Sequence, residues 1–412
     1  MRLPVFFIIV LFILPILIDL YISADCKQIW GKKGRLIYWV TSILCYAILI
    51  VAISLPRRSV DSDLTPVMWL LYIYLSIYVG KIFYLLFSVF GRSLKKVFKW
   101  KNGWYPFRWM GLFIGLFFIG MMFVGTGYTR HHIVVEDVDV YSNNLPPSFE
   151  NYQIAQISDL HVGTWGKDTE FIQNLVKKIN GLNPDLIVFT GDIVNRETGE
   201  IYPFIDALAR LKAKDGVYSI LGNHDYGDYM NWPDSIAREE NNKLLASIER
   251  GMGWNLLNNK KVFLKQGNDS IILIGVENWG EPPFPKYGNL EIALSSNPDS
   301  LYNQNDGNFK ILLSHNPEHW NQEVSKNTNI DLTLSGHTHA MQGMIKIGDW
   351  KWSPSKFRYE NWGGLYGSKN KNGEPTQLYV NIGAGSVGMP SRLLAAYPEI
   401  TLFKLKKGEP RY

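Results

Sequence analysis

Five of the eight histidines in this 412-residue chain stand in short polar clusters, most of which also hold aspartate or asparagine. The clusters read SDLH (158–161), GDIVN (191–195), GNHD (222–225), SHNP (314–317) and GHTH (336–339). Imidazole, carboxylate and amide-oxygen ligands without thiolate suit divalent Mn, Fe, Zn, Co or Ni. The chain has only two cysteines, which excludes a cysteine-rich zinc or iron–sulfur site and a disulfide scaffold. The residue types therefore predict a site for divalent metal ions.

Two of the clusters contain a pair of candidate ligands separated by one residue. Asp159 and His161 form one pair, and His337 and His339 form the other, so a single loop could present two ligands to a metal ion. Asp192 could bridge two ions because one carboxylate has two oxygens. Two cations about 4 Å apart lower the pKa of a shared water and clamp a phosphoryl oxygen. The spacing is therefore typical of a two-metal hydrolytic site.

Each cluster directly follows a short apolar run that is rich in β-branched residues. We predict strands over 152–157, 186–190, 217–221, 271–276, 310–313, 332–334, 378–381 and 400–405. Amphipathic stretches over 168–179 and 201–211 predict helices between some of these strands. The alternation indicates an α/β sheet with layers on both faces. In such sheets ligands collect beyond the carboxyl ends of the strands, which is where the clusters stand.

The order of the five clusters resembles the signature of the calcineurin-like dinuclear metallophosphoesterases. That signature runs Asp-x-His, Gly-Asp-x-x-Asn, Gly-Asn-His-Asp, Ser-His and Gly-His-x-His, and here the blocks span about 180 residues in the same order. The segments IGAGSVGMPSR (382–392) and YPEITLF (397–403) look like the membrane-associated bacterial branch, which includes enzymes that cleave UDP-diacylglucosamine. The resemblance covers residues 150–406. It implies a phosphoesterase domain over 151–412, built as a two-sheet sandwich flanked by helices.

The resemblance also implies a set of ligands for two divalent metal ions. The first ion would lie on Asp159, His161 and His339, the second on Asn223, His315 and His337, with Asp192 bridging the two. Every ligand position of the family pattern is filled, so an inactive relative is not expected.

Four further residues receive roles outside this ligand set. His224 would face the substrate, stabilising the pentavalent phosphorus or protonating the leaving oxygen. Asp225 would orient His224 through a hydrogen bond. Asn195 stands where many relatives have Asp, and we expect it to fix the loop or to contact substrate. Arg392 could contact a substrate phosphate, or could simply belong to a tight turn at the end of a strand.

Residues 1–130 differ from the rest of the chain in charge and hydropathy. They hold 15 Lys and Arg against 4 Asp, a net charge of +11, whereas residues 131–412 have a net charge of −6. Four apolar stretches approach the length of about 20 residues that a helix needs to cross a bilayer. They cover residues 3–22, 36–55, 66–90 and 109–128. The sequence therefore predicts a four-helix transmembrane region over 1–130 and a linker over 131–150.

Charges between the predicted spans indicate an orientation. Ten Lys and Arg lie in the loops after the first and third spans, against four on the opposite face. The positive-inside rule puts the ten-charge face in the cytoplasm and the phosphoesterase domain outside it, at a bacterial inner or cell membrane. Lys81, within the third span, could mark a ligand site or could extend its ammonium toward an interface, and we expect the latter.

The substrate is less sharply indicated. A net charge of −6 without a basic stripe argues against nucleic acid. An aromatic stretch could form a lip that grips a lipid-like substrate at the bilayer surface, or could be ordinary packing; it contains Trp350, Trp352, Phe357, Tyr359, Trp362 and Tyr366. The sequence predicts a membrane-anchored, metal-dependent phosphoesterase that hydrolyses phosphoester or pyrophosphate bonds in a phosphorylated small molecule or a lipid or envelope precursor. The alternative is a membrane binding or sensing protein whose metal site is structural.

Overall fold

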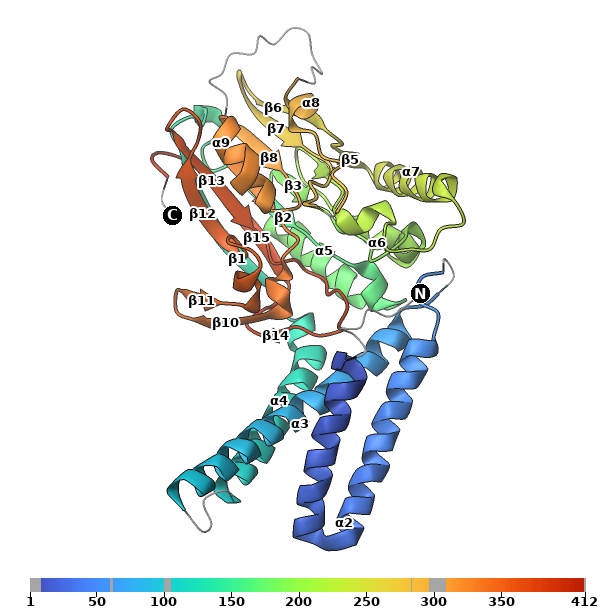
Figure 1. The fold of residues 1–412 in the computed structure, drawn as a ribbon. Coiled ribbons are helices and arrows are strands. Elements are labelled where there is room, and N and C mark those ends of the chain that lie inside the picture. Colours follow the sequence, from blue (N-terminus) through green and yellow to red (C-terminus); the bar gives the residue numbers. More distant parts are fainter. Residues whose placement is uncertain (1–8, 60–61, 100–104, 283, 296–308, 411–412) are drawn as a thin grey trace. The chain divides into compact units, whose positions relative to one another are not determined.

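The computed structural model describes residues 9–59, 62–99, 105–282, 284–295 and 309–410 (Figure 1). Contacts divide the chain into two compact units. The helical unit comprises Met1–Arg57 and Asp63–Thr126, and the α/β unit comprises Arg58–Ser62 and Gly127–Tyr412. The α/β unit is therefore discontinuous in sequence, because a short segment between two helices belongs to it.

Three helices among the described residues are long and apolar enough to cross a membrane. They are α2 (Leu14–Ser54), α3 (Thr65–Phe98) and α4 (Tyr105–Gly127), and the π-helical turn η1 (Ile9–Ile13) precedes α2. The sequence predicts four spans, and the described parts of the first two predicted stretches both fall in η1 and α2.

Helix α2 folds back on itself at Gly31. The backbone of Gly31 has φ 68° and ψ −159°, which is not helical. The hydroxyl of Tyr46 donates a 3.0 Å hydrogen bond to the Asp19 carboxylate, 27 residues earlier in the chain. In a straight helix 27 residues would cover about 40 Å, so the two arms of α2 must lie side by side, as Figure 1 shows. The structure thus gives three helices, and the count of four crossings stays a prediction.

A buried polar cluster surrounds Asp19 in the helical unit. The Asp19 carboxylate accepts hydrogen bonds from four side chains: Tyr38, Tyr46, Tyr78 and Lys81. The Lys81 ammonium lies 2.8 Å from Asp19 and also donates to Ser42 Oγ at 3.0 Å. The expectation that Lys81 extends toward an interface is therefore wrong. A full negative charge within reach holds the ammonium among the helices instead.

Two six-stranded sheets form the body of the α/β unit. The first has the order β1 (Val134–Ser142), β15 (Glu399–Lys407), β2 (Gln153–Ile157), β3 (Leu186–Phe189), β4 (Val217–Ser219) and β5 (Trp254–Leu256). The second has the order β12 (Gly364–Lys369), β13 (Pro375–Val380), β9 (Leu332–Ser335), β8 (Lys310–Leu313), β7 (Asp269–Gly275) and β6 (Lys260–Gln266). A small third sheet contains β11 (Trp350–Trp352), β10 (Gly343–Ile347) and β14 (Leu393–Leu394). Strands β2 to β5 run parallel, and so do β13, β9, β8 and β7.

Apolar side chains fill the space between the two large sheets. The first sheet contributes Ile154, Leu186 and Phe403 to this core, and the second contributes Leu273, Ile311 and Leu332. All six are fully buried. Burial of this kind is the dominant favourable term in folding and fixes the two sheets face to face.

Helices cover the outer faces of both sheets. Helix α5 (Glu170–Leu182) buries five apolar residues at helical spacing against the first sheet: Phe171, Ile172, Leu175, Val176 and Ile179. The second sheet packs against α8 (Leu290–Ser295) and the turn η7 (Trp320–Val324), which leads into α9 (Ser325–Asn327). The other α-helices in the described part of this unit are α6 (Ile205–Leu208) and α7 (Ser235–Gly251). The predicted α/β unit with layers on both faces is confirmed.

The predicted linker over 131–150 needs correction. Strand β1 lies within it and pairs in parallel with β15 over nine residues, from Val134 opposite Glu399 to Ser142 opposite Lys407. The pattern VVEDVDVYS alternates apolar and charged residues because β1 is an edge strand that leaves part of its surface to water. This segment is therefore part of the first sheet rather than a tether.

Candidate metal centre

The five polar clusters meet at one end of the two sheets. Each begins within three residues of the end of a strand, and parallel neighbours bring their carboxyl ends to the same edge. Backbone hydrogen bonds then join the loops: Asp159 N–H donates to Gly191 O at 2.9 Å, and His161 N–H donates to Asp192 O at 3.2 Å. On the other sheet, Gly336 N–H donates to His315 O at 3.0 Å.

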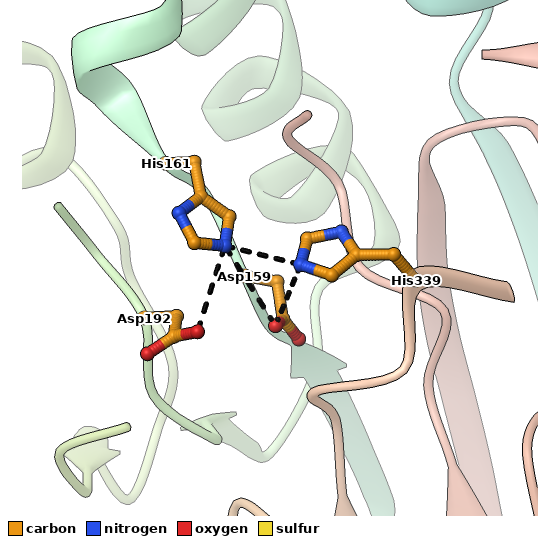
Figure 2. A group of neighbouring side chains, drawn as sticks. All are labelled: Asp159, His161, Asp192 and His339. Atoms are coloured by element: carbon orange, nitrogen blue, oxygen red, sulfur yellow. Dashed lines mark hydrogen bonds and ion pairs between the residues drawn. The ribbon is translucent and has the colours of Figure 1, made fainter. Parts of the chain in front are cut away.

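Six predicted ligands converge in two groups. Asp159, His161, Asp192 and His339 form the first, and Asp192, His315 and His337 form the second. Within each group the candidate ligand atoms lie within 4.8 Å of one another, and Asp192 belongs to both groups. Figure 2 shows the first group, with the imidazoles of His161 and His339 turned toward the carboxylates.

Individual distances show how closely the groups approach. In the first group, His339 Nε2 lies 3.1 Å from Asp159 Oδ1, and His161 Nε2 lies 3.5 Å from Asp192 Oδ2. In the second, His315 Nε2 lies 3.2 Å from Asp192 Oδ2. The seventh predicted ligand, Asn223, places its Oδ1 at 3.2 Å from the same His315 nitrogen.

Burial and neighbouring charges set the protonation of these groups. Burial lowers the pKa of His161 well below its usual value and lowers that of His337 to about 3, so both imidazoles are neutral at pH 7. Burial alone would raise the pKa of Asp192, but His315 and His224 hold it well below the usual value. Neutral imidazole and ionised carboxylate are the forms that bind a cation.

Two of the buried imidazoles have a ring nitrogen without a hydrogen-bond partner among the described residues. His161 Nε2 and His339 Nε2 face each other at 3.0 Å, and the Nδ1 atoms of both rings have no hydrogen-bond partner among the described residues. The charge of Asp192 raises the pKa of His315 to about 9 against the effect of burial, so a cation would have to displace that proton. Divalent cations fit this set of nitrogen and oxygen ligands.

Left-handed backbone occurs at five of the seven predicted ligands. The φ angles of these non-glycine residues lie between 43° and 75° at Asp159, His161, Asp192, His337 and His339. Such conformations cost of order 1 kcal/mol or more each and persist where surrounding contacts enforce them. Here the enforcing contacts are the loop-to-loop hydrogen bonds. The left-handed backbone thus lowers the stability of the fold, and it directs these side chains toward one another.

Gly336 shows why the last cluster begins with glycine. A Cβ at this position would collide with Ser158 Oγ and with a carboxylate oxygen of Asp159. Any larger residue would therefore separate the first cluster from the last, and the two groups of ligands could not form.

His224 is held beside the ligand groups. Its Nδ1–H donates to the backbone oxygen of Asn195 at 2.6 Å, and its ring stacks on Tyr229 with centroids 4.4 Å apart. The ring also meets that of His161 edge to face at 4.8 Å. With Nδ1 engaged by a carbonyl, Nε2 is the nitrogen left for chemistry.

Asp225 does not orient His224 as predicted. Its carboxylate accepts hydrogen bonds from four backbone N–H groups: Asp192, Ile193, Val194 and Gly222. Burial and the charge of Asp192 raise the pKa of Asp225 to about 7. Asp225 therefore fixes the loop that carries Asp192, and the carbonyl of Asn195 takes the orienting role. A backbone acceptor leaves no signal in the sequence.

Arg392 is buried and bonded to backbone oxygens. Its side chain is 0% exposed, and its guanidinium donates to the backbone oxygens of Gly385, Ile382, Ala396 and Tyr397. Gly385 N–H in turn donates to Asp159 O at 2.7 Å. Arg392 thus supports the loop beneath Asp159. Of the two roles that the sequence left open for Arg392, these contacts support the one in the turn.

Asn195 is buried and fixes the loop rather than lining an open surface. Its Nδ2 donates to Thr164 Oγ1 at 2.9 Å, and its backbone N–H donates to Glu200 Oε2 at 2.6 Å. Of the two expected roles, the structure supports loop fixing.

Sequence reasoning missed two tyrosines at the site. The hydroxyl of Tyr359 lies 3.0 Å from His337 Nε2, and the hydroxyl of Tyr229 accepts a 2.8 Å hydrogen bond from Asn223 Nδ2. Tyr359 appears in the predicted aromatic stretch but without this role, and nothing in the sequence distinguishes Tyr229.

A second missed feature is the support behind Asn195. The neighbouring Arg196 forms a 2.9 Å ion pair with Glu200 and donates to Ser62 Oγ at 3.0 Å and Ser62 O at 2.8 Å. Asn231 N–H also donates to the backbone oxygen of Arg58 at 2.9 Å. The described residues of the segment Arg58–Ser62, which connects α2 to α3, are thus bonded to the α/β unit near the metal centre.

Comparisons with known proteins agree with this site. Residues 152–341 match the family model described as calcineurin-like phosphoesterase. The chain is 31% identical over 293 residues to the uncharacterized metallophosphoesterase YkuE of Bacillus subtilis, a match covering 68% of this chain and 90% of that protein. It is 30% identical over 281 residues to a transmembrane protein with metallophosphoesterase domain from Danio rerio, covering 66% of this chain and 57% of that protein. It is also 29% identical over 243 residues to the UDP-2,3-diacylglucosamine pyrophosphatase LpxG of Chlamydia trachomatis, covering 48% and 68%.

Proposed function

Because the chain belongs to the calcineurin-like metallophosphoesterase family and is a hydrolase of phosphoester bonds, we propose that it is a membrane-anchored enzyme acting on a phosphodiester or pyrophosphate bond of a lipid or envelope precursor. The observation that carries the proposal is the sharing of one buried carboxylate, Asp192, by two groups of nitrogen and oxygen ligands.

The proposed ligand assignment follows these two groups. Asp159, His161 and His339 would hold one divalent ion, Asn223, His315 and His337 would hold the other, and Asp192 would bridge them. When bound, such a pair supplies positive charge for the phosphoryl oxygens and lowers the pKa of a water that attacks phosphorus. The ligand types fit Mn, Fe, Zn, Co or Ni.

His224 is the proposed acid. Its Nε2–H would donate a proton to the leaving oxygen, and the Asn195 carbonyl accepts from Nδ1 and so orients the ring for this step. The stacked ring of Tyr229 keeps the imidazole from turning away. Positioned acids of this kind contribute about 10²- to 10⁴-fold to rate.

Similarity and charge support the proposed substrate class and location. One relative is named a UDP-2,3-diacylglucosamine pyrophosphatase, whose substrate joins a lipid to a phosphoanhydride. The helical unit would keep the enzyme at the bilayer where lipid precursors reside, and the Lys and Arg distribution favours a catalytic domain outside the cytoplasm of a bacterial cell. The net charge of −6 over residues 131–412 argues against nucleic acid as substrate.

The test uses the full chain purified in detergent. Hydrolysis of bis-p-nitrophenyl phosphate, and separately of a diacylated UDP-sugar, is measured after removal of metals and after addition of Mn, Fe, Zn, Co or Ni. We expect no turnover without metal and restored turnover with at least one ion. Failure with all five ions on both substrates would contradict the enzyme proposal and favour a binding or sensing protein with a structural metal site.

The orientation has its own test. Reporter fusions after residue 412, with a fusion in the loop after the third predicted span as control, are expected to report opposite sides of the membrane, the first outside the cytoplasm. A cytoplasmic signal from the first fusion would overturn the proposed location.

A further inference from the structure

The hairpin of β10 and β11 exposes an apolar face. Its register pairs Ile345 with Trp352 and Ile347 with Trp350. Alternate residues of a strand and their cross-strand partners share one face of a ribbon, so these four side chains lie together. Ile347 is 70% exposed and Trp350 is 56% exposed. The usual arrangement, in which a ribbon buries its apolar face, is therefore reversed here.

Phe357 enlarges this face. Its ring meets the ring of Trp352 edge to face with centroids 6.3 Å apart, and the side chain is 84% exposed. Contiguous exposed apolar residues on a folded protein mark an interaction surface. The hairpin surface consists of Ile345, Ile347, Trp350, Trp352 and Phe357.

The opposite face of the hairpin is fixed in place. Met344 is buried, and the Lys346 ammonium forms a 2.9 Å ion pair with Glu136 of β1. These contacts leave the hairpin surface facing away from the unit. Glu136 stands nine residues after Gly127, where α4 ends, and nine residues reach at most about 30 Å. The residue that fixes the hairpin is thus tethered to the end of α4 by nine residues of chain.

Basic residues accompany the apolar ones. Residues 343–360 carry Lys346, Lys351, Lys356 and Arg358 against Asp349 and Glu360, a net charge of +2. Of the four cations, Lys346 and Arg358 form ion pairs with Glu136 and Glu281, so Lys351 and Lys356 are the two cations that we assign to lipid. Tryptophan beside lysine is the composition favoured at the interface of a bilayer, where the ring meets the headgroups and the cation meets anionic lipid. A soluble partner would not explain why the residue that fixes this hairpin follows the end of a membrane helix by only nine residues of chain.

We propose that the hairpin surface inserts into the interface of the bilayer that the chain's own helices enter, and thereby presents the metal centre to phosphorylated groups at headgroup depth. The part of this proposal that names the substrate class rests on the proposed function. The insertion itself depends only on the hairpin surface.

Hydrogen bonds connect the hairpin surface to the metal centre. Ser353 Oγ donates to Ala340 O at 2.6 Å, and Thr338 Oγ1 donates to Trp362 O at 2.6 Å. Tyr359, two residues after Phe357, lies 3.0 Å from the proposed ligand His337. The segment that follows β11 is therefore bonded to the loop carrying His337 and His339. A bilayer touching the hairpin surface would lie beside that loop.

Membrane depth can be measured without turnover. The full chain carrying C26S, C45S and I347C, with a nitroxide on residue 347, is placed in nanodiscs of phosphatidylethanolamine and phosphatidylglycerol in a 3:1 ratio. Collisions with oxygen, which favours the bilayer, are compared with collisions with a water-soluble nickel chelate. The matched control is I236C on α7, which is 64% exposed and lies far from the hairpin in sequence.

We expect the label at 347 to collide preferentially with oxygen and the label at 236 with nickel. Equal nickel access at both positions would overturn the insertion, and so would spin–spin broadening at 347, which would indicate a second copy of the chain on this surface.

A second measurement needs no cysteine substitution. The double variant I347D/W350E is compared with I236D for hydrolysis of a diacylated UDP-sugar in vesicles and of soluble bis-p-nitrophenyl phosphate. We expect KM for the vesicle substrate to rise at least tenfold in the double variant alone, with the soluble substrate unaffected. Equal loss on both substrates would contradict a membrane role. Absence of all turnover in the unsubstituted chain would contradict the proposed function but leave the nitroxide result intact.

Discussion

Two buried aspartates, one in each unit, show how differently a protein can hold a negative charge. Asp19 in the helical unit accepts hydrogen bonds from three tyrosine hydroxyls and from the Lys81 ammonium. Asp192 in the α/β unit receives one hydrogen bond from a backbone N–H, that of His224, and otherwise faces the imidazoles of His161 and His315. Asp19 is neutralised by the protein itself, whereas Asp192 is surrounded by side chains that can bind a cation.

The difference separates a structural carboxylate from a candidate metal ligand. A buried charge is costly unless donors or counter-ions compensate it. Four protein donors saturate Asp19, which leaves no oxygen for an ion. Around Asp192 the partner is the imidazole of His315, 3.2 Å away, whose proton balances the charge and can be exchanged for a metal ion. The surroundings of a buried carboxylate, and not its burial, indicate its function.

Removal of Asp192 should have the largest effect. We expect D192A to lose both metal ions together and to lower kcat for bis-p-nitrophenyl phosphate by about 10³-fold or more, because the bridging ligand belongs to both groups. Metals per chain, measured by elemental analysis, check the first part. Retention of two ions would contradict bridging. D19A is the matched control and should retain both ions.

Substitution of His224 should affect turnover without affecting metal. We expect H224A to keep two ions per chain and to lose about 10²- to 10⁴-fold in kcat, since it removes an acid and not a ligand. Loss of metal from this variant would show that the role assignment is wrong. Activity that falls more for substrates with poor leaving groups would strengthen the assignment.

Substitution of Asp19 should affect stability and leave chemistry alone. We expect D19N to destabilise the protein by about 3 kcal/mol, because the Lys81 ammonium then stays buried without its counter-ion. Thermal unfolding in detergent gives the measurement, with the D19N/K81M double variant as control, which should recover part of the loss. Unchanged kcat on the soluble substrate is expected. A large drop in kcat would show that the helical cluster is linked to catalysis.

Glu249 offers a third buried carboxylate, one kept neutral by a proton. Burial raises its pKa from 4.5 to about 8, and Ser219 Oγ donates to its Oε2. An acid whose pKa is raised by folding contributes stability that is complete below pH 4.5 and declines as the pH rises toward 8. Between pH 6 and pH 8.5 we expect the free energy of unfolding of the unsubstituted chain to fall by about 2 kcal/mol more than that of E249Q. The amide of the variant stays neutral over this range. Urea unfolding at the two pH values measures this, and parallel losses would contradict the shifted pKa.

The candidate metal centre could be predicted from the sequence because each of its clusters consists of neighbouring residues in the chain. Every cluster is a contiguous block after its own strand, and parallel strands bring their ends together without further information. Prediction of the seven ligands therefore required only that the strands be placed correctly. The structure brings all seven residues together.

Features that depend on contacts between residues far apart in sequence could not be predicted. The donors to the Asp225 carboxylate and the acceptors of Arg392 are backbone atoms, which carry no residue signature. Strand β1 looks like a linker because an edge strand half open to water needs only a few apolar residues. The fold-back of α2 depends on one glycine, and the cluster around Asp19 depends on tyrosines from two helices.

The hydrogen bonds between Arg196 and Ser62 have a practical consequence for anyone who wishes to study the hydrolase by itself. A recombinant fragment that starts after the last helix would lack both acceptors and so would expose a guanidinium that the whole chain covers. A fusion of the α/β unit to an unrelated membrane anchor would also lack these acceptors and expose the same guanidinium. The ribosome also synthesises this segment before Arg196 and Asn231, the residues of the α/β unit that are hydrogen-bonded to it.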